Sequence, residues 1–312
     1  MEPIMRRYQN DDDYWQFRQF LREVLLLNQR HEISWHVARL DYWRWFGIDI
    51  LGDGQLERDV FIWENSDGRM AAVLNREGAG EAFLQMQPAL RSPGLVNEML
   101  ATAEAELAVP VAEGRRKLTV WADWHDDLLH SALQRLGYER KGAPERQHHI
   151  RVSAPAPEAA APPGYTVRAM AEGVDRAARC WCSWKAFHAN EPEERYPGGE
   201  WYPAIERCPL YRRDLDLVAV APGGEIASFT TVWYDDATRT AVFEPVGTHP
   251  AHRRLGLARA VMCEGLRRAQ RLGATLAFVG GYSPSANALY GGLSTDYDLS
   301  EPWIREWPAP SP

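Results

Sequence analysis

The sequence predicts two tandem α/β domains of one plan, each a mixed, mostly antiparallel sheet flanked by helices (an α+β arrangement). One reason is length, because 312 residues exceed the roughly 100 to 200 residues of a common domain. Another is segment 153–164, which has four prolines, five alanines and no large apolar residue, as linkers often do. The third is a weak internal repeat of strand and helix patterns on both sides of this segment. We therefore expect one domain at 1–152 and a second at 165–312.

The composition argues against several classes of protein. Apolar residues make up 45% of the chain and charged residues 25%, which is ordinary globular usage and not that of a disordered chain. The formal charge of −8 offers no excess of cations for a phosphate backbone, so nucleic acid is not an expected partner. No apolar run approaches the roughly 20 residues that span a bilayer, and four cysteines are too few for a disulfide framework. We expect a soluble cytoplasmic protein without a membrane partner, as a monomer or homodimer.

Periodicity and turn signals predict the elements of each half. In the second half they give a strand, a helix, a three-strand antiparallel meander, a helix that Gly273 ends, a strand, a short helix and two closing strands. These elements are expected at 165–168, 172–187, 215–221, 226–234, 240–249, 257–272, 275–279, 285–293, 295–299 and 303–307. The first half repeats the order at 59–64, 70–76, 81–87, 95–107, 118–122, 126–136 and 147–152.

The most informative segment is 244–259, EPVGTHPAHRRLGLAR, where an apolar strand gives way to a basic, glycine-bearing turn that opens a helix. At a helix start the first N–H groups lack intrahelical partners and the dipole is positive, so the turn predicts an anion cradle. Gly256 and Ala258 leave room for a ligand to approach. Guanidinium donors suited to phosphate come from Arg253, Arg254 and Arg259. The glycine patterns of triphosphate and dinucleotide loops are missing, which favours another diphosphate-bearing ligand.

This segment resembles a known family signature. Residues 253–258, Arg-Arg-Leu-Gly-Leu-Ala, are similar to the Arg/Gln-x-x-Gly-x-Gly/Ala acyl-CoA signature of GNAT (Gcn5-related) acyltransferases, and 287–290 resemble that family's Asn-x-x-Tyr. The element order agrees over almost all of 165–307, although Leu-Ser-Thr at 293–295 replaces the usual Leu-Gly-aromatic. The resemblance implies acetyl-CoA as co-substrate and a splayed fourth strand that binds its pantetheine. The implied cofactor-binding residues are Val246, Gly247, Thr248, Arg253, Arg254, Leu255, Gly256, Leu257, Ala258, Arg259 and Asn287.

Acyl transfer to an amine needs two proton-transfer groups. An alkyl ammonium has a pKa of about 10 and must lose a proton before it attacks, and Glu244, on the strand before the cofactor-binding backbone, is our candidate base. A backbone N–H near 246–248 can stabilise the oxyanion. The departing thiolate benefits from a proton, which Tyr290 can donate, as its family counterpart is thought to do. In the structural alternatives, Glu244 faces solvent, Tyr290 is a core residue, Asn287 bridges strand and helix, and the arginines form a solvated face.

The first half has lost the key residues of this pattern. Placing Pro88 opposite Pro250 keeps an arginine and a glycine in the turn, but Pro93 removes a backbone donor and Val96 adds a branched side chain. The positions opposite Glu244, Asn287 and Tyr290 then hold Ala82, His130 and Leu133. We therefore predict a degenerate first domain without catalysis that helps to form the acceptor pocket.

The resulting hypothesis is an acetyl-CoA-dependent N-acetyltransferase that acts on a small-molecule amine by direct transfer in a ternary complex. The tandem layout is similar to that of mycothiol-synthase-like proteins, but layout alone does not transfer a substrate. Acidic and aromatic residues in 188–213 suggest a cationic acceptor, with a solvated acidic loop as the alternative. The rival hypothesis is a non-catalytic acyl-CoA-binding sensor or scaffold; transfer from charged tRNA is disfavoured by the intact signature. No metal is expected, because Cys180 and Cys182 diverge on a helix and the histidines lack ligand spacing.

Overall fold

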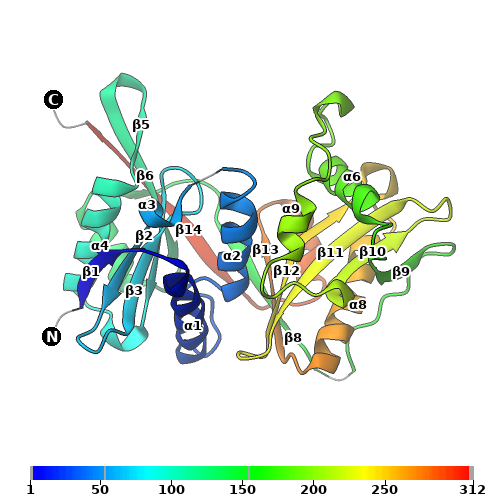
Figure 1. The fold of residues 1–312 in the computed structure, drawn as a ribbon, viewed down its shortest axis with the longest axis horizontal. Coiled ribbons are helices and arrows are strands. Elements are labelled where there is room, and N and C mark those ends of the chain that lie inside the picture. The colour runs from blue at the N-terminus through cyan, green and yellow to red at the C-terminus, as the bar shows by residue number, and fades with distance from the viewer. Residues whose placement is uncertain (1–2, 53, 154, 309–312) are drawn as a thin grey trace. The chain divides into compact units, whose positions relative to one another are not determined.

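The computed structural model describes residues 3–52, 54–153 and 155–308, which divide into two compact units (Figure 1). The first unit comprises the described residues up to Gln147 together with those from Asp298 onward, and the second unit runs from His148 to Tyr297. This division differs from the predicted one. It places 148–152 in the second unit and the end of the chain in the first, and it does not fall at the 153–164 linker.

The first unit contains a mixed sheet in the order β1-β2-β3-β4-β6-β14, in which β4 and β6 are parallel and the other neighbours in this order are antiparallel. Its strands are β1 (Ile4–Arg7), β2 (Val60–Glu64), β3 (Met70–Asn75), β4 (Glu81–Met86), β5 (Val109–Val111), β6 (Arg115–Asp123), β7 (Glu139–Arg140) and β14 (Tyr297–Pro308). Its α-helices are α1 (Asp11–Leu27), α2 (Val37–Tyr42), α3 (Leu56–Asp59), α4 (Pro93–Glu106) and α5 (Asp127–Arg135).

Helices cover both faces of this sheet because its strands alternate apolar side chains between the two. On β2, Phe61 and Trp63 pack with residues of α4 and α5, whereas Val60 and Ile62 pack with residues of α1 and the segment after it. Asn10 caps α1 by accepting a hydrogen bond from the Asp12 N–H, and the three aspartates of the first turn suit the positive end of the helix. The elements expected in the first half began at residue 59, so α1 was not among them.

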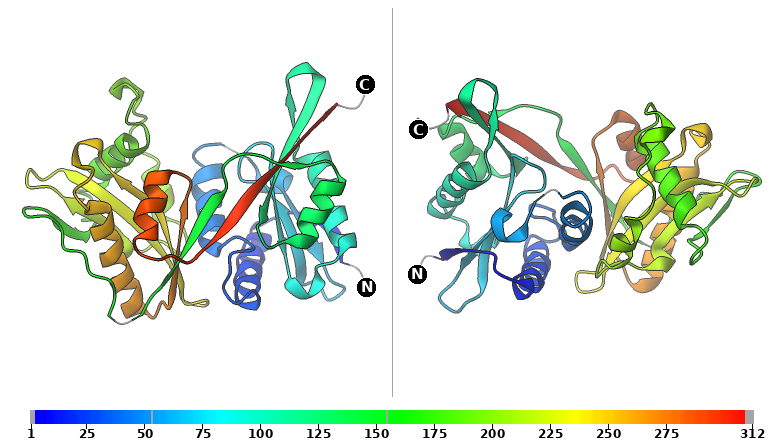
Figure 2. Two further views of the ribbon diagram at one scale, coloured as in Figure 1. Left: turned by 180° about the vertical axis from the view of Figure 1, so that it is seen from behind. Right: turned by 45° about the horizontal axis from the view of Figure 1, so that its top comes forward.

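The last strand, β14, belongs to the sheet of the first unit. Residues 300–308 pair antiparallel with 123–115 of β6 over nine register positions (Figure 2). The two closing strands expected at 295–299 and 303–307 are thus one strand, most of which pairs with β6. In exchange, β8 (Glu145–Arg151), which ends the first half, lies beside β13 in the second unit, where the Val152 N–H donates to the Thr275 carbonyl at 3.0 Å.

The second unit has a sheet in the order β8-β13-β12-β11-β10-β9. Besides β8 its strands are β9 (Thr166–Ala169), β10 (Asp216–Val220), β11 (Ile226–Asp235), β12 (Thr240–Thr248) and β13 (Leu276–Gly281). Its α-helices are α6 (Arg176–Phe187), α7 (Tyr202–Glu206), α8 (Leu257–Leu272) and α9 (Pro284–Gly291). The predicted meander is confirmed as β10-β11-β12, and Gly273 ends α8 with φ of +101°, a conformation that glycine adopts without strain.

Apolar clusters hold the elements of the second unit in place, and one of them joins Ala219, Ala227 and Val261 of β10, β11 and α8. Phe243 of β12 packs with Met262 and Leu266 of α8, and the same cluster includes Tyr290 of α9. A separate cluster contains Cys180 of α6 and residues of α7, β10 and β11. In the part of the chain that the structure describes, none of the helices is long and apolar enough to cross a membrane.

Candidate active site

The strands β12 and β13 separate at their carboxyl ends. Their parallel pairing runs from Thr240↔Leu276 to Val242↔Phe278 and stops there, while β12 continues to residue 248 against β11. The β11–β12 register also shifts between Thr230 and Val232. Among the described strands, none continues the pairing along 243–248 on the β13 side, so the backbone groups there can serve a ligand. This is the strand splay that the family resemblance implied.

The helix α8 begins beside this opening with an uncapped N-terminus. Gly256 precedes the helix with φ of +78°, and no side chain caps its first N–H groups. The first intrahelical bond runs from the Ala260 N–H to the Gly256 carbonyl, so the amides of residues 257–259 have no acceptor within the helix. A Cβ built on Gly256 would meet no described atom within 4 Å, which leaves the approach to these amides open. Together these features form an anion-binding terminus.

One cavity of about 640 Å³ connects the splayed strands, this helix start and α9. The volume lies within the usual range of small-molecule sites. The structure brings both predicted catalytic residues and most predicted cofactor-binding residues to its wall; only Leu255 and Asn287 of that set do not line it. The predicted residues that do are Glu244, Val246, Gly247, Thr248, Arg253, Arg254, Gly256, Leu257, Ala258, Arg259 and Tyr290.

The three arginines of the turn have different partners. Arg253 donates to the carbonyls of Ala186 at 2.9 Å and Thr248 at 3.4 Å, which ties the turn to the end of α6. Arg259 donates to the Gly292 carbonyl at 2.8 Å, just past α9. Arg254 is exposed, and it lies in the turn where this turn lines the cavity. The guanidiniums of Arg253 and Arg259 therefore also hold together the segments that line the cavity.

The catalytic candidates lie near each other in this cavity. Tyr290 is only 6% exposed, and burial together with the nearby charge of Glu244 raises the pKa of its phenol above the ordinary value of 10. The hydroxyl therefore stays protonated at neutral pH. Glu244 has an exposed side chain, and its backbone carbonyl accepts a hydrogen bond from Trp233 Nε1 at 2.6 Å. The pair thus offers a hydrogen-bond donor and a carboxylate on the wall of one cavity.

Comparison with known proteins agrees with this geometry. Residues 179–291 match the family model described as "Acetyltransferase (GNAT) family". The chain is 29% identical over 257 residues to a mycothiol acetyltransferase of Kineococcus radiotolerans, covering 78% of each protein. It is 24% identical over 248 residues to a mycothiol acetyltransferase of Paenarthrobacter aurescens, covering 75% of this chain and 72% of that protein.

Residues 179–291 therefore form a GNAT acetyltransferase domain. Solved structures show the same fold over nearly the whole chain. A GCN5-related N-acetyltransferase from Sphaerobacter thermophilus matches with a TM-score of 0.67 and 16% identity over 97% of this chain and 95% of that one. A tandem GNAT protein from the clavulanic acid biosynthesis pathway matches with a TM-score of 0.64 and 15% identity over 99% of each. The family match and the two relatives confirm the N-acetyltransferase class inferred from the sequence, and the solved structures confirm the tandem fold.

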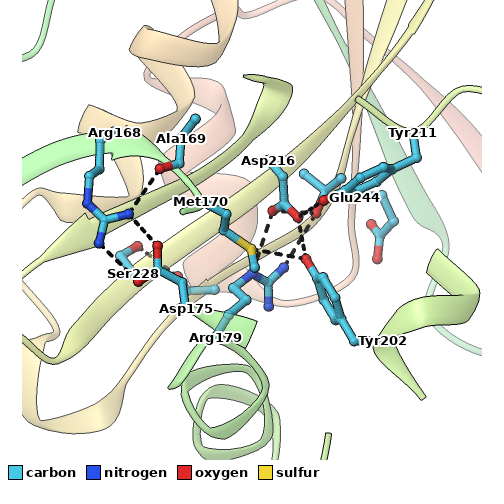
Figure 3. A network of polar contacts seen from close by, with 12 residues as sticks. Arg168, Ala169, Met170, Asp175, Arg179, Tyr202, Tyr211, Asp216, Ser228 and Glu244 are labelled. Carbon is cyan, nitrogen blue, oxygen red and sulfur yellow. Dashed lines mark hydrogen bonds and ion pairs between the residues drawn. The ribbon is translucent and has the colours of Figure 1, made fainter. Parts of the chain in front are cut away.

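A buried polar network lies between α6, α7 and the strands of the second unit, close to Glu244 (Figure 3). Asp216 of β10 accepts hydrogen bonds from Tyr202 of α7 and, at 3.0 Å, from Tyr211, and burial raises the pKa of its carboxyl group. The Nε of Arg179, on α6, lies 3.8 Å from Oδ1 of Asp216. The Cζ of its guanidinium lies 3.7 Å from the centre of the Phe229 ring. Tyr211 packs edge to face on Trp233, which holds the Glu244 carbonyl. The network therefore fixes α6 and α7 against the strands next to the candidate base.

Two carboxylates of the acidic segment 188–213 are exposed to solvent. Glu193 pairs with Lys185 at 3.2 Å and is 65% exposed, and Glu191 lies 3.8 Å from Arg195. This arrangement favours the solvated-loop interpretation for these two carboxylates. The four cysteines are free and buried, and burial raises the pKa of both Cys180 and Cys182 to about 11. These two thiols are therefore protonated at neutral pH, and no cysteine lines the cavity.

Sequence reasoning missed several residues of the cavity wall. Gly280, Tyr282 and Ser283 lie at or just after the end of β13, and the rule that sites gather at the carboxyl ends of parallel strands could have found them. The wall also includes Ala186 and Phe187, at the end of α6. No sequence signal marks these two residues, because they reach the cavity only through the packing of α6 on β11 and β12.

Proposed function

We propose that the second unit transfers the acetyl group of acetyl-CoA to a primary amine of a small molecule by direct attack in a ternary complex. The observation that carries this proposal is the single cavity that joins an uncapped helix N-terminus, splayed strand edges, a carboxylate and a buried phenol. The amides of residues 257–259 and Arg254 bind the diphosphate, and the free edge of β12 at 246–248 binds the pantetheine.

In the reaction, Glu244 first takes a proton from the substrate ammonium, directly or through water, and the neutral amine nitrogen then forms a bond to the thioester carbon. The nitrogen of this adduct loses its second proton to solvent. A backbone N–H of 246–248 holds the carbonyl oxygen as it gains charge. The carbon–sulfur bond then breaks and the electron pair leaves on sulfur. Because its pKa is raised, Tyr290 is a weaker acid than a thiol, so it stabilises the thiolate mainly by donating a hydrogen bond. The proton that the sulfur finally takes comes from solvent.

The cysteines favour direct transfer over an acyl-enzyme. A cysteine nucleophile would need a thiolate within reach of the thioester. In the described chain no cysteine lines the cavity, and burial raises the thiol pKa of Cys180, Cys182 and Cys263. Steady-state rates measured against both substrates should therefore give intersecting double-reciprocal lines; parallel lines would contradict direct transfer.

The acceptor is tested by assaying thiol release from acetyl-CoA with the purified full chain and a panel of primary amines. The panel includes the acceptor of the mycothiol acetyltransferases to which the chain is similar. Calorimetry with CoA measures binding separately. Binding without turnover on any amine would replace the transferase by the acyl-CoA sensor or scaffold, and absence of CoA binding would contradict both.

We further propose a cytoplasmic location and no nucleic-acid or metal requirement. Four free, buried cysteines suit a reducing compartment. Fractionation of cells that produce the tagged chain tests the location. If no metal is required, a strong chelator should leave the rate of turnover unchanged. Light scattering decides between monomer and homodimer.

A further inference from the structure

One buried group next to the candidate acid has no role in the proposed reaction. His148 is the first residue of the second unit and lies on β8, and its side chain is only 1% exposed. The sequence suggested an ordinary strand residue, and His148 does not line the cavity. It reaches this unit only because β8, which ends the first half of the chain, pairs beside β13.

His148 contacts the Asn-x-x-Tyr segment at both of its ends. Its Nε2 lies 3.0 Å from Oδ1 of Asn287, and because an amide oxygen only accepts, the imidazole donates this hydrogen bond. Its ring packs edge to face on Tyr290, with centres 5.7 Å apart and planes at 72°. The ring of Tyr297 also packs against the imidazole, with ring centres 5.9 Å apart. The imidazole is therefore enclosed by the ring of Tyr290 and the helix that carries it.

The strand β13 confines the same segment. A Cβ on Gly281 would overlap Oδ1 of Asn287 and lie 3.2 Å from Cδ2 of Tyr290. Glycine at this position lets α9 approach the strand closely, so Asn287 and Tyr290 are held between Gly281 and His148. This placement also explains why Asn287 does not reach the cavity: its amide oxygen points to the imidazole.

We propose that His148 is a positioning residue for Tyr290. It holds α9 through Asn287 and the phenol ring by direct contact, so that the hydroxyl stays where the leaving sulfur forms. This inference rests on the proposed function, because Tyr290 has to act on the thiolate for its placement to matter. A catalytic group displaced by about 1 Å can lose on the order of 100-fold in rate, so two contacts to a buried ring are sufficient to affect turnover.

The first test compares two replacements of similar size. His148→Phe keeps an aromatic ring but loses the donor to Asn287, and we expect kcat to fall about 10-fold with the KM for acetyl-CoA within about twofold. His148→Gln keeps an amide donor and should recover most of the lost kcat. Arg151→Ala, at an exposed position of the same strand, is the matched control and should behave as wild type. A raised KM with unchanged kcat in His148→Phe, or a His148→Gln as slow as His148→Phe, would overturn the proposal.

A double-mutant cycle separates positioning from general loss of structure. In a Tyr290→Phe background the hydroxyl to be placed is gone, so His148→Phe should cost less than about twofold more in kcat. An equal factor in both backgrounds would show that His148 acts through overall stability, and the proposal would fail. It would also fail if Tyr290→Phe turned over at the wild-type rate.

A crystal structure of His148→Phe gives a readout that does not need turnover. We expect α9 and the Tyr290 hydroxyl to shift while the turn at Gly256 is unchanged. If the wild-type protein proves inactive on every amine, the proposed function fails, and this structure still decides the role of His148. An unmoved Tyr290 in a folded His148→Phe protein would overturn the inference whatever the activity.

Discussion

The turn after β4 in the first unit and the turn after β12 in the second begin alike and end differently. Both enter a short 3₁₀ turn at a proline, Pro88–Leu90 in one and Pro250–His252 in the other. The helix α4 then starts with Pro93, which lacks an N–H, and Ser92 caps it by accepting from the Leu95 N–H at 3.2 Å. The helix α8 starts after Gly256 with no cap. The start of α4 therefore has a missing N–H and a capped one, whereas the first N–H groups of α8 remain available to a ligand.

The cavities of the two units differ as well, and the one described here for the first unit is lined by residues other than those of the turn after β4. The first unit has a cavity of about 40 Å³, enough for roughly one water molecule, where the second has about 640 Å³. Stacked rings of Phe83 and Trp121 and the edge-on ring of Trp35 line it. Arg91, the counterpart of Arg253, is paired with Asp126. One fold plan therefore supports a binding site only where the cap, the donors and the space all permit it.

The largest expected effect comes from separating the halves at the predicted linker. Residues 1–152 lack β14, whose nine-position ladder covers β6, and residues 165–312 lack β8. We expect each half alone to be insoluble or unfolded, because each has lost a strand of its sheet, and co-expression to restore a soluble pair. Circular dichroism and co-purification measure this. The intact protein nicked at 159 should remain folded, and a cooperative melt of 1–152 alone would contradict the expectation.

The second prediction concerns a buried tyrosine in each unit. Tyr290→Phe should lower kcat by at least about 100-fold with little change in the KM for acetyl-CoA, since only the leaving thiolate loses a donor. Tyr138→Phe removes a buried hydroxyl in the first unit, where it donates to Glu104, and should leave kcat within about twofold of wild type. Initial rates decide. Similar rates for Tyr290→Phe and wild type would rule out a hydrogen bond from this hydroxyl to the leaving thiolate.

The third prediction places the cap of the first unit in the second. Gly256→Ser offers a hydroxyl to the α8 amides and strains a backbone with φ of +78°, so we expect the Kd for CoA to rise about 10- to 100-fold. The reverse change, Ser92→Gly, should leave CoA affinity as it is and destabilise the first unit by a few tenths of a kcal/mol. Calorimetry and urea melts measure both. Wild-type affinity in Gly256→Ser would show that the amides do not bind the diphosphate.

The last prediction concerns stability and not activity, and it is a pH dependence confined to the first unit. Burial and the nearby charge of Glu145 raise the pKa of Glu32 from 4.5 to about 8. Between these pH values the unfolded chain has lost this proton while the folded chain keeps it, so this group's contribution to stability falls as pH rises from about 4.5 to 8. Glu32→Gln stays neutral, and at pH 8 its free energy of unfolding should exceed that of wild type by about 4 kcal/mol, with almost no gain at pH 4.5. An equal gain at both pH values would show that the ionisation of Glu32 is not the cause.

Local sequence was sufficient for much of the second half. The glycines and proline around the meander mark its turns, and the run of apolar residues on one side of 257–272 marks α8. The signature at 253–258 also located the cavity, because the chemistry of a helix start is set by the residues of the turn itself. Asn287 shows where this reasoning stops. The family resemblance implied a cofactor contact for Asn287, with a bridge between strand and helix as the alternative. The structure turns its amide oxygen toward His148 of β8, 139 residues earlier in the chain.

The sequence by itself therefore determined the repeated order of elements and the anion-binding turn, since both depend on residues adjacent in the chain. Tertiary structure alone decided which unit each terminal strand completes. The pattern of 295–307 fits a strand in either sheet, and the long pairing of β14 with β6 places the end of the chain in the first unit. Tertiary structure likewise decided that His148 packs against the ring of Tyr290. Strand pairing between residues far apart in the chain depends on which sheet edges the rest of the fold leaves open.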